Sequence, residues 1–116
     1  MKHSADYYIE HLQMEPHVEG GYFKECLLEK EERNLWSSIY FMLAKGEVSH
    51  FHRLKSDEVW YYHDGNALTI YMIDETGKLT AAKLGLDLEK GEVPQILVPK
   101  GMIFGSAMEE EGFSLV

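Results

Sequence analysis

The sequence predicts an all-β domain with one short helix at its N-terminus. From residue 35 onward, short segments rich in aromatic and β-branched side chains alternate with turns that contain Gly, Pro, Asn or Asp. Such turns recur at intervals of about ten residues, which is typical of a β-sandwich or β-barrel. The chain has 116 residues, enough for one domain with a modest hydrophobic core. We therefore expect residues 1–116 to form a single domain.

The first expected element is a helix from Ser4 to about Met14. Serine commonly caps helix N-termini, because its hydroxyl oxygen accepts a hydrogen bond from a free backbone N–H. Helical spacing places three apolar side chains on one stripe: Tyr8, Ile9 and Leu12. Pro16 limits the helix, and Gly20 and Gly21 then predict a turn that leads into a strand.

Further strands are expected in succession along the rest of the chain. They cover residues 35–43, 47–54, 57–63, 66–73, 78–84, 95–98 and 102–107. A charged loop is expected over 30–34 and an exposed connection over 86–92. Asp64 and Gly65 predict a hairpin turn in which both residues have φ > 0, and the turn at residues 99–101 predicts a hairpin of the last two strands. Residues 112–116 read as the start of a strand that either pairs in the sheet or needs residues that follow it.

Composition excludes several classes of partner. With 11 basic and 20 acidic side chains, the chain has a net charge of −9, whereas nucleic acids and anionic membranes bind basic surfaces. The N-terminus is too polar for a signal peptide, and no apolar run is long enough to span a bilayer. The single cysteine, Cys26, rules out an intrachain disulfide and is typical of a reducing compartment. We expect a cytoplasmic protein.

Residues 46–65 carry the strongest chemical signal of the chain. Side chains two apart in a strand point to the same face, so His50 and His52 are expected to project together. A following strand that carries Glu58 and ends at the Asp64-Gly65 turn would bring a carboxylate beside them. Imidazole and carboxylate groups in one pocket suit either metal binding or proton transfer.

The same stretch resembles the first motif of the cupin superfamily, G-x5-H-x-H-x3,4-E-x6-G. The register places these residues in its defined positions: Gly46, His52, Leu54, Glu58 and Gly65. The second cupin motif contains P-x-G-x2-H, and here it corresponds to Pro99, Gly101 and Phe104.

The chain is also similar, along most of its length, to the Cupin-5 (DUF985) family. The residues that carry this similarity are Glu15-Pro16-His17, Glu19-Gly20-Gly21-Tyr22-Phe23, Ser38-Ile39-Tyr40-Phe41, His52-Arg53, Ser56-Asp57-Glu58-Val59-Trp60, Leu84-Gly85, Pro94-Gln95 and Val98-Pro99-Lys100-Gly101. The resemblance implies a double-stranded β-helix, or jelly roll, and a homodimer, but no particular activity. It also implies a further strand after the last residue of this sequence, so the resemblance leaves open whether the end of the sheet is complete.

The resemblance bears directly on metal binding. Metal-dependent cupins offer three histidines and a glutamate, whereas the corresponding positions here hold His52, Leu54, Glu58 and Phe104. Leucine and phenylalanine cannot coordinate a cation, although His50 would compensate in a three-ligand site made of His50, His52 and Glu58. We prefer the metal-free alternative, in which Glu58 is hydrogen-bonded to His52 and raises its pKa for use as a general base.

We therefore expect a small organic ligand in the barrel, without a metal or another cofactor. His52 and Glu58 are the predicted catalytic residues, with chemistry like that of the epimerases and isomerases of the superfamily. The predicted ligand-binding residues are Glu19, Tyr22, Tyr40, Trp60, Tyr62, Gln95 and Phe104. Two alternatives stay open: a metal-dependent enzyme that uses His50, His52 and Glu58, and a non-catalytic structural or interaction module.

Overall fold

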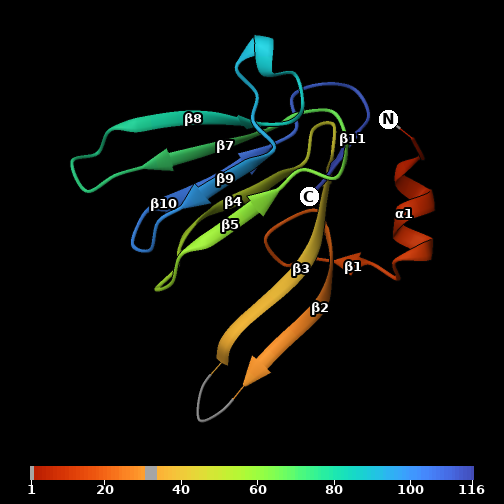
Figure 1. The fold of residues 1–116 in the computed structure, drawn as a ribbon, viewed down its shortest axis with the longest axis horizontal. Coiled ribbons are helices and arrows are strands. Elements are labelled where there is room, and N and C mark those ends of the chain that lie inside the picture. Colours follow the sequence, from red (N-terminus) through yellow and green to blue (C-terminus); the bar gives the residue numbers. More distant parts are fainter. Residues whose placement is uncertain (1, 31–33) are drawn as a thin grey trace.

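The computed structural model describes residues 2–30 and 34–116, and the fold is all-β with one short helix, as predicted (Figure 1). Most of the predicted charged loop at 30–34 lies outside the described residues. The elements are α1 (Ala5–His11), β1 (Glu15–Pro16), β2 (Tyr22–Lys30), β3 (Asn34–Ala44), β4 (Val48–Arg53), β5 (Glu58–Tyr61), β6 (Asp64–Gly65), β7 (Leu68–Ile73), β8 (Leu79–Leu84), a 3-10 turn (Leu88–Lys90), β9 (Gln95–Val98), β10 (Ile103–Ala107) and β11 (Phe113–Leu115). No described helix is long and apolar enough to cross a membrane.

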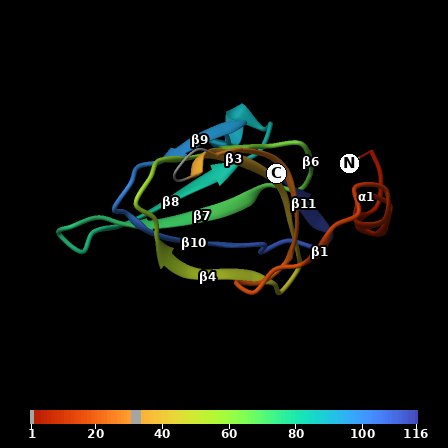
Figure 2. The same ribbon diagram turned by 90° about the horizontal axis from the view of Figure 1, so that it is seen from below.

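The strands form three antiparallel groups. A five-stranded sheet has the order β1-β2-β3-β11-β6, a four-stranded sheet has the order β4-β10-β7-β8, and β5 pairs with β9. Figure 2 shows the four-stranded sheet with β8, β7, β10 and β4 side by side. The main core lies between these groups and includes Leu43, Leu68, Ile70, Leu84 and Phe104. This arrangement agrees with a jelly roll.

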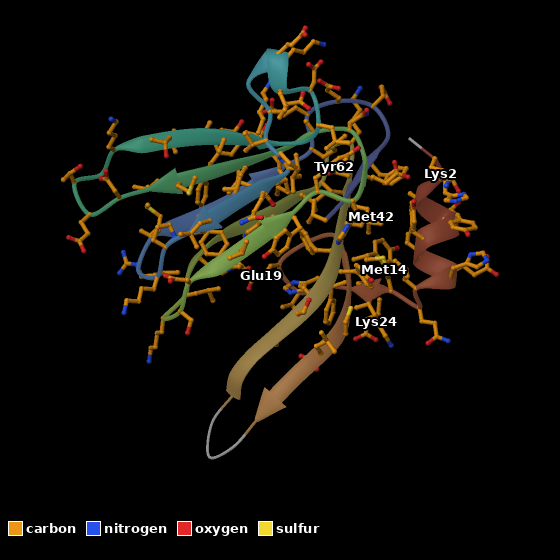
Figure 3. All side chains as sticks on the ribbon, viewed as in Figure 1. Lys2, Met14, Glu19, Lys24, Met42 and Tyr62 are labelled. Carbon is orange, nitrogen blue, oxygen red and sulfur yellow. The ribbon has the colours of Figure 1, made fainter. Side chains whose placement is uncertain are left out.

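The helix is capped at both ends and packs through the predicted stripe. The Ser4 hydroxyl oxygen accepts a hydrogen bond of 3.1 Å from the Tyr7 N–H, which confirms the predicted cap. The helix ends at His11, before Met14, because Gln13 has φ 55° and the Met14 N–H bonds back to the Ile9 carbonyl. Its apolar side chains cover a second cluster, which consists of Met14, Met42, Phe113 and Leu115. Figure 3 shows Met14 and Met42 between α1 and β3.

The prediction of a hairpin turn at Asp64-Gly65 is wrong. These residues form β6, which pairs with β11, and of the two only Gly65 has a positive φ, at 92°. A type I′ turn requires φ > 0 at both central residues. Glycine is needed here for a different reason, because a Cβ at Gly65 would lie 2.1 Å from the Phe113 carbonyl oxygen. The glycine therefore allows β6 to approach β11.

The predicted hairpin of the last two long strands is also wrong. β9 pairs with β5, whereas β10 lies between β4 and β7 in the other sheet, so the turn at residues 99–101 crosses between sheets. The same topology separates the two strands of the histidine and glutamate motif, since β4 and β5 are not neighbours in any sheet. Local turn signals cannot distinguish a hairpin from a crossover in a sandwich.

The last residues of the chain dock in the sheet. β11 lies between β3 and β6, and the Val116 N–H and carbonyl exchange hydrogen bonds of 2.9 Å with Phe41. All four residues of 113–116 are buried. The expectation that this segment pairs in the sheet is confirmed.

Candidate functional site

A cavity of about 830 Å³ opens between β3, β4 and β5. Its lining comes from these strands and the connection between β4 and β5, and from β2 and the loop that precedes it. His63, Phe104 on β10 and Val116, which follows β11, complete it. The lining includes the predicted catalytic residues, His52 from β4 and Glu58 from β5. Two strands that are not hydrogen-bonded to each other therefore bring these side chains to one place.

His52 and Glu58 do not form the predicted hydrogen bond. Among the described residues, His52 Nδ1 lies 2.9 Å from the His50 carbonyl oxygen, and Glu58 Oε2 accepts a hydrogen bond of 3.2 Å from Trp60 Nε1. A carbonyl oxygen is an acceptor, so Nδ1 carries the proton, and Nε2 is the unprotonated nitrogen of the neutral ring. When the ring of His52 is protonated, its positive charge favours the ionised form of Glu58.

Glu58 has a perturbed pKa. Burial raises the pKa of this carboxyl above 4.5, and this effect outweighs the hydrogen bond from Trp60 and the charge of His52, which both lower it. A carboxyl group whose pKa is raised by burial holds its proton closer to neutral pH, where it can serve as a general acid or base. The free oxygen, Oε1, has no described hydrogen-bond donor.

The expectation that His50 and His52 share a face is wrong, because β4 contains a β-bulge. Along the ladder with β10, His52 pairs with Phe104 but Ser49 pairs with Ser106, so β4 has one extra residue between these pairs. The bulge puts Ser49 and His52 on the cavity side. His50 is exposed and does not line the cavity.

Aromatic rings form the walls next to His52. The ring centroids of His52 and Phe104 are 4.4 Å apart, and those of Trp60 and Phe104 are 6.3 Å apart in an edge-to-face arrangement. Trp60 also meets Phe41 edge-to-face at 6.0 Å. Apolar walls with a small number of polar groups are typical of sites for small organic molecules.

The other predicted ligand-binding residues divide into two groups. Glu19 and Tyr40 line the cavity, as Trp60 and Phe104 do. Tyr22, Tyr62 and Gln95 do not. Their side chains are directed elsewhere: Tyr22 packs on the cluster under the helix, the Tyr62 hydroxyl donates to the Gly65 carbonyl at 2.5 Å, and Gln95 lies on the exposed face of β9.

The polar lining residues that were not predicted include His17 and Ser49. His17 Nδ1 accepts a hydrogen bond of 2.9 Å from the Glu19 N–H, which holds this loop at the cavity wall. Gly20 and Gly21, which follow, provide the positive φ angles of this turn. A Cβ at Gly20, where φ is 110°, would lie 1.9 Å from the Val48 carbonyl oxygen, so the loop packs directly on β4. The residue types around His17 indicated the loop, but no pattern in the sequence indicates the bulge that turns Ser49 inward.

Comparison with known proteins agrees with this architecture. Residues 6–116 match the model of the Cupin superfamily (DUF985). The chain belongs to this family. The match confirms the resemblance found in the sequence. A search of curated protein sequences gave no match to this cupin.

Solved structures of two similar proteins cover nearly all of this cupin. Protein SO0799 from Shewanella oneidensis is 58% identical with a TM-score of 0.92, and the match covers 97% of this chain and 74% of that one. A hypothetical protein from Leishmania major is 34% identical with a TM-score of 0.86, and the match covers 97% and 78%. A variant of oxalate decarboxylase from Bacillus subtilis is 22% identical with a TM-score of 0.59 and covers 86% and 26%, a likeness in fold alone.

A divalent metal ion does not fit the donor set of this cupin. The four positions where the superfamily implies ligands hold His52, Leu54, Glu58 and Phe104, and the Phe104 ring packs against the imidazole. Across the described residues, no group of three or more His, Cys, Asp or Glu side chains is placed to hold a metal ion. The alternative set with His50 is not assembled, because the bulge separates His50 from the other two.

Proposed function

We propose that this cupin binds a small organic molecule in its cavity and moves a proton on it through Glu58 and His52. The observation that carries the proposal is the raised pKa of Glu58 in a cavity that it shares with His52. A desolvated carboxyl group donates or accepts a proton near neutral pH more readily than an exposed one. The imidazole contributes a second proton acceptor, because its Nδ1 proton is held by the His50 carbonyl.

The cavity walls support an organic ligand of modest size. Trp60 and Phe104 supply apolar surface for its carbon skeleton, while Ser49, Glu19 and His17 add polar groups at the wall. Proton transfer of this kind suits a carbon next to a carbonyl group, where one residue removes a proton and the other returns it. The proposed reaction class is therefore an isomerisation or epimerisation without a metal ion.

The bulge in β4 supplies a matched control for testing the proposal. His50 and His52 lie on one strand, but only His52 lines the cavity. A panel of small carboxylic acids, keto acids and sugar nucleotides would be screened by thermal shift against wild type, His52→Gln, Glu58→Gln and His50→Gln. We expect at least one compound to stabilise wild type and His50→Gln more than the other two variants. Equal stabilisation of all four proteins would contradict binding at this site.

The proton transfer has its own readout. A compound that binds would be incubated with the protein in D₂O, and NMR would follow the replacement of its carbon-bound hydrogen by deuterium. We expect exchange with wild type and His50→Gln, and a loss of about a hundredfold or more with Glu58→Gln, since general acid–base catalysis contributes about that factor. If wild type binds the compound but does not catalyse the exchange, the protein only binds its ligand, and this result would contradict the catalytic proposal. The homodimer implied by the family stays a prediction, which light scattering would check.

A further inference from the structure

His17 lines the same cavity as the proposed catalytic pair, and its ring is held in one orientation. The ring meets Phe23 edge-to-face with centroids 4.8 Å apart, and it meets Phe41 in the same way at 5.9 Å. Its Nδ1 accepts a hydrogen bond of 2.9 Å from the Glu19 N–H. The imidazole is therefore fixed before any ligand binds, which is what a residue that orients a ligand requires.

The backbone of residues 17–21 is fixed as well. The Gly20 N–H donates a hydrogen bond of 3.0 Å to the His17 carbonyl, which closes a turn. The turn is bonded to β4, because the His50 N–H donates to the Glu19 carbonyl at 3.0 Å. The ring of His17 is thus held at a constant position relative to β4.

The hydrogen bonds of His17 and His52 give the two rings opposite tautomers. A backbone N–H is a donor, so the Nδ1 of His17 is unprotonated and the proton of the neutral ring is on Nε2. The Nδ1 of His52 carries its proton toward the His50 carbonyl oxygen, which leaves Nε2 as an acceptor. Because both rings line the cavity, His17 offers a ligand a donor and His52 offers it an acceptor.

Both tautomers are set by the fold. The same backbone links the two rings, since Glu19 bonds the ring of His17 through its N–H and bonds His50 through its carbonyl. His50 in turn accepts from the ring of His52. Among the described residues, the Nε2 of His17 has no hydrogen-bond partner, and the Nε2 of His52 has none either. These two nitrogens are therefore available to a ligand.

A continuous row of aromatic rings connects His17 to His52 along the cavity wall. Phe41 meets His17 with centroids 5.9 Å apart and meets Trp60 at 6.0 Å. Phe104 meets Trp60 at 6.3 Å and His52 at 4.4 Å. All five residues line the cavity. Apolar surface between a donor and an acceptor suits a carbon skeleton that carries polar groups at two positions.

We propose that His17 is a ligand-binding residue, whose Nε2–H donates a hydrogen bond to an oxygen of the molecule on which His52 and Glu58 act. This inference rests on the proposed function, because it adds a second contact to the same ligand. It also narrows the class of ligand. Besides the carbonyl group next to the proton that moves, the ligand carries another oxygen that accepts a hydrogen bond.

Two substitutions separate ligand binding from the structure of the loop. In His17→Asn, the amide oxygen takes the position of Nδ1 and accepts from the Glu19 N–H as in an Asx turn, but no atom replaces Nε2. In His17→Gln, the amide nitrogen takes the position of Nε2 and still donates, while the hydrogen bond to Glu19 is lost. Amide hydrogen exchange at Glu19, followed by NMR, should stay slow in His17→Asn and become about tenfold faster in His17→Gln.

The probes for the binding test are cyclohexane-1,4-dione and cyclohexanone. Both have a ring and a carbonyl group with adjacent hydrogens, and only the dione has a second oxygen. NMR titration with each probe gives the ratio of the two dissociation constants, which cancels any effect of a substitution on the cavity as a whole. We expect wild type and His17→Gln to bind the dione about tenfold more tightly than cyclohexanone, and His17→Asn to bind both equally, since one hydrogen bond contributes about that factor.

An unchanged preference for the dione in His17→Asn would overturn the proposal, because the second oxygen would then be bound elsewhere. A preference that is lost in His17→Gln but kept in His17→Asn would also overturn it, since the ring would act only through the loop. Wild type that shows no preference, or does not bind the dione at millimolar concentration, would do the same. Failure of the proposed proton transfer is seen separately, as an absence of deuterium exchange in wild type, and leaves the ratio of dissociation constants unaffected.

Discussion

Asp64 is the residue for which the structure makes the sharpest energetic prediction. Its carboxylate accepts hydrogen bonds from the Tyr8 hydroxyl at 2.8 Å and from the backbone N–H groups of Lys2, His3 and Gly65. Burial alone would raise the pKa of Asp64, but these hydrogen bonds outweigh it and lower the pKa to about 2. Through these hydrogen bonds, the carboxylate holds the first residues of the chain and the helix against β6.

The magnitude follows from the difference between the folded and unfolded pKa of Asp64. Lowering the pKa from 3.8 to about 2 corresponds to about 2 kcal/mol, since each tenfold change in acidity is worth about 1.4 kcal/mol. A lowered pKa gives stability that is present above the unfolded pKa and is lost as the pH falls through the folded one. Asp64→Asn should therefore reduce the free energy of unfolding by about 2 kcal/mol at neutral pH, and the deficit should shrink between about pH 4 and pH 2.

Urea unfolding of wild type and Asp64→Asn at a series of pH values measures this difference directly. Glu110→Gln is the matched control, because it removes a carboxylate at an exposed position. It should change the free energy of unfolding by less than about 0.5 kcal/mol. A deficit for Asp64→Asn that stays constant from neutral pH to about pH 2 would refute the reasoning, since it would show that the charge of Asp64 is not the source of the stability.

Three further changes test other parts of the structure. Glu58→Gln should raise the Tm near pH 7 but not below about pH 4. Burial raises the pKa of Glu58 above its ordinary value, so the folded protein loses stability as the pH rises through this raised pKa and the buried carboxyl ionises. An unchanged Tm near pH 7 would contradict the desolvation. Gly20→Ala should cost at least about 2 kcal/mol in urea unfolding, because φ is 110° and the new Cβ would lie 1.9 Å from the Val48 carbonyl oxygen; a neutral effect would place this loop elsewhere. Ser49→Ala should cost about 1–3 kcal/mol in the same assay, since Ser49 Oγ bonds both the hydroxyl and the N–H of buried Ser106, and a smaller loss would argue against the bulge that turns Ser49 inward.

Local signals in the sequence predicted the elements better than their pairing. The Ser4 cap and the residues of β9 were predicted as observed, because capping and alternation depend on neighbours in the chain. The partners of β9 and β10 depend on which sheet each strand joins, and a turn at residues 99–101 is compatible with either outcome. Asp64 was interpreted as a turn residue, whereas its role depends on contacts with Lys2 and Tyr8 far away in the sequence.

The candidate site shows the same division. Motif spacing indicated His52 and Glu58, and both line the cavity, although the strands that carry them, β4 and β5, are not neighbours in a sheet as expected. Strand parity predicted that His50 would accompany His52, and one extra residue in β4 reverses that parity. A bulge is defined by the pairing of two strands, so a single strand sequence does not reveal it. The outcome excludes His50 from the site and adds Ser49.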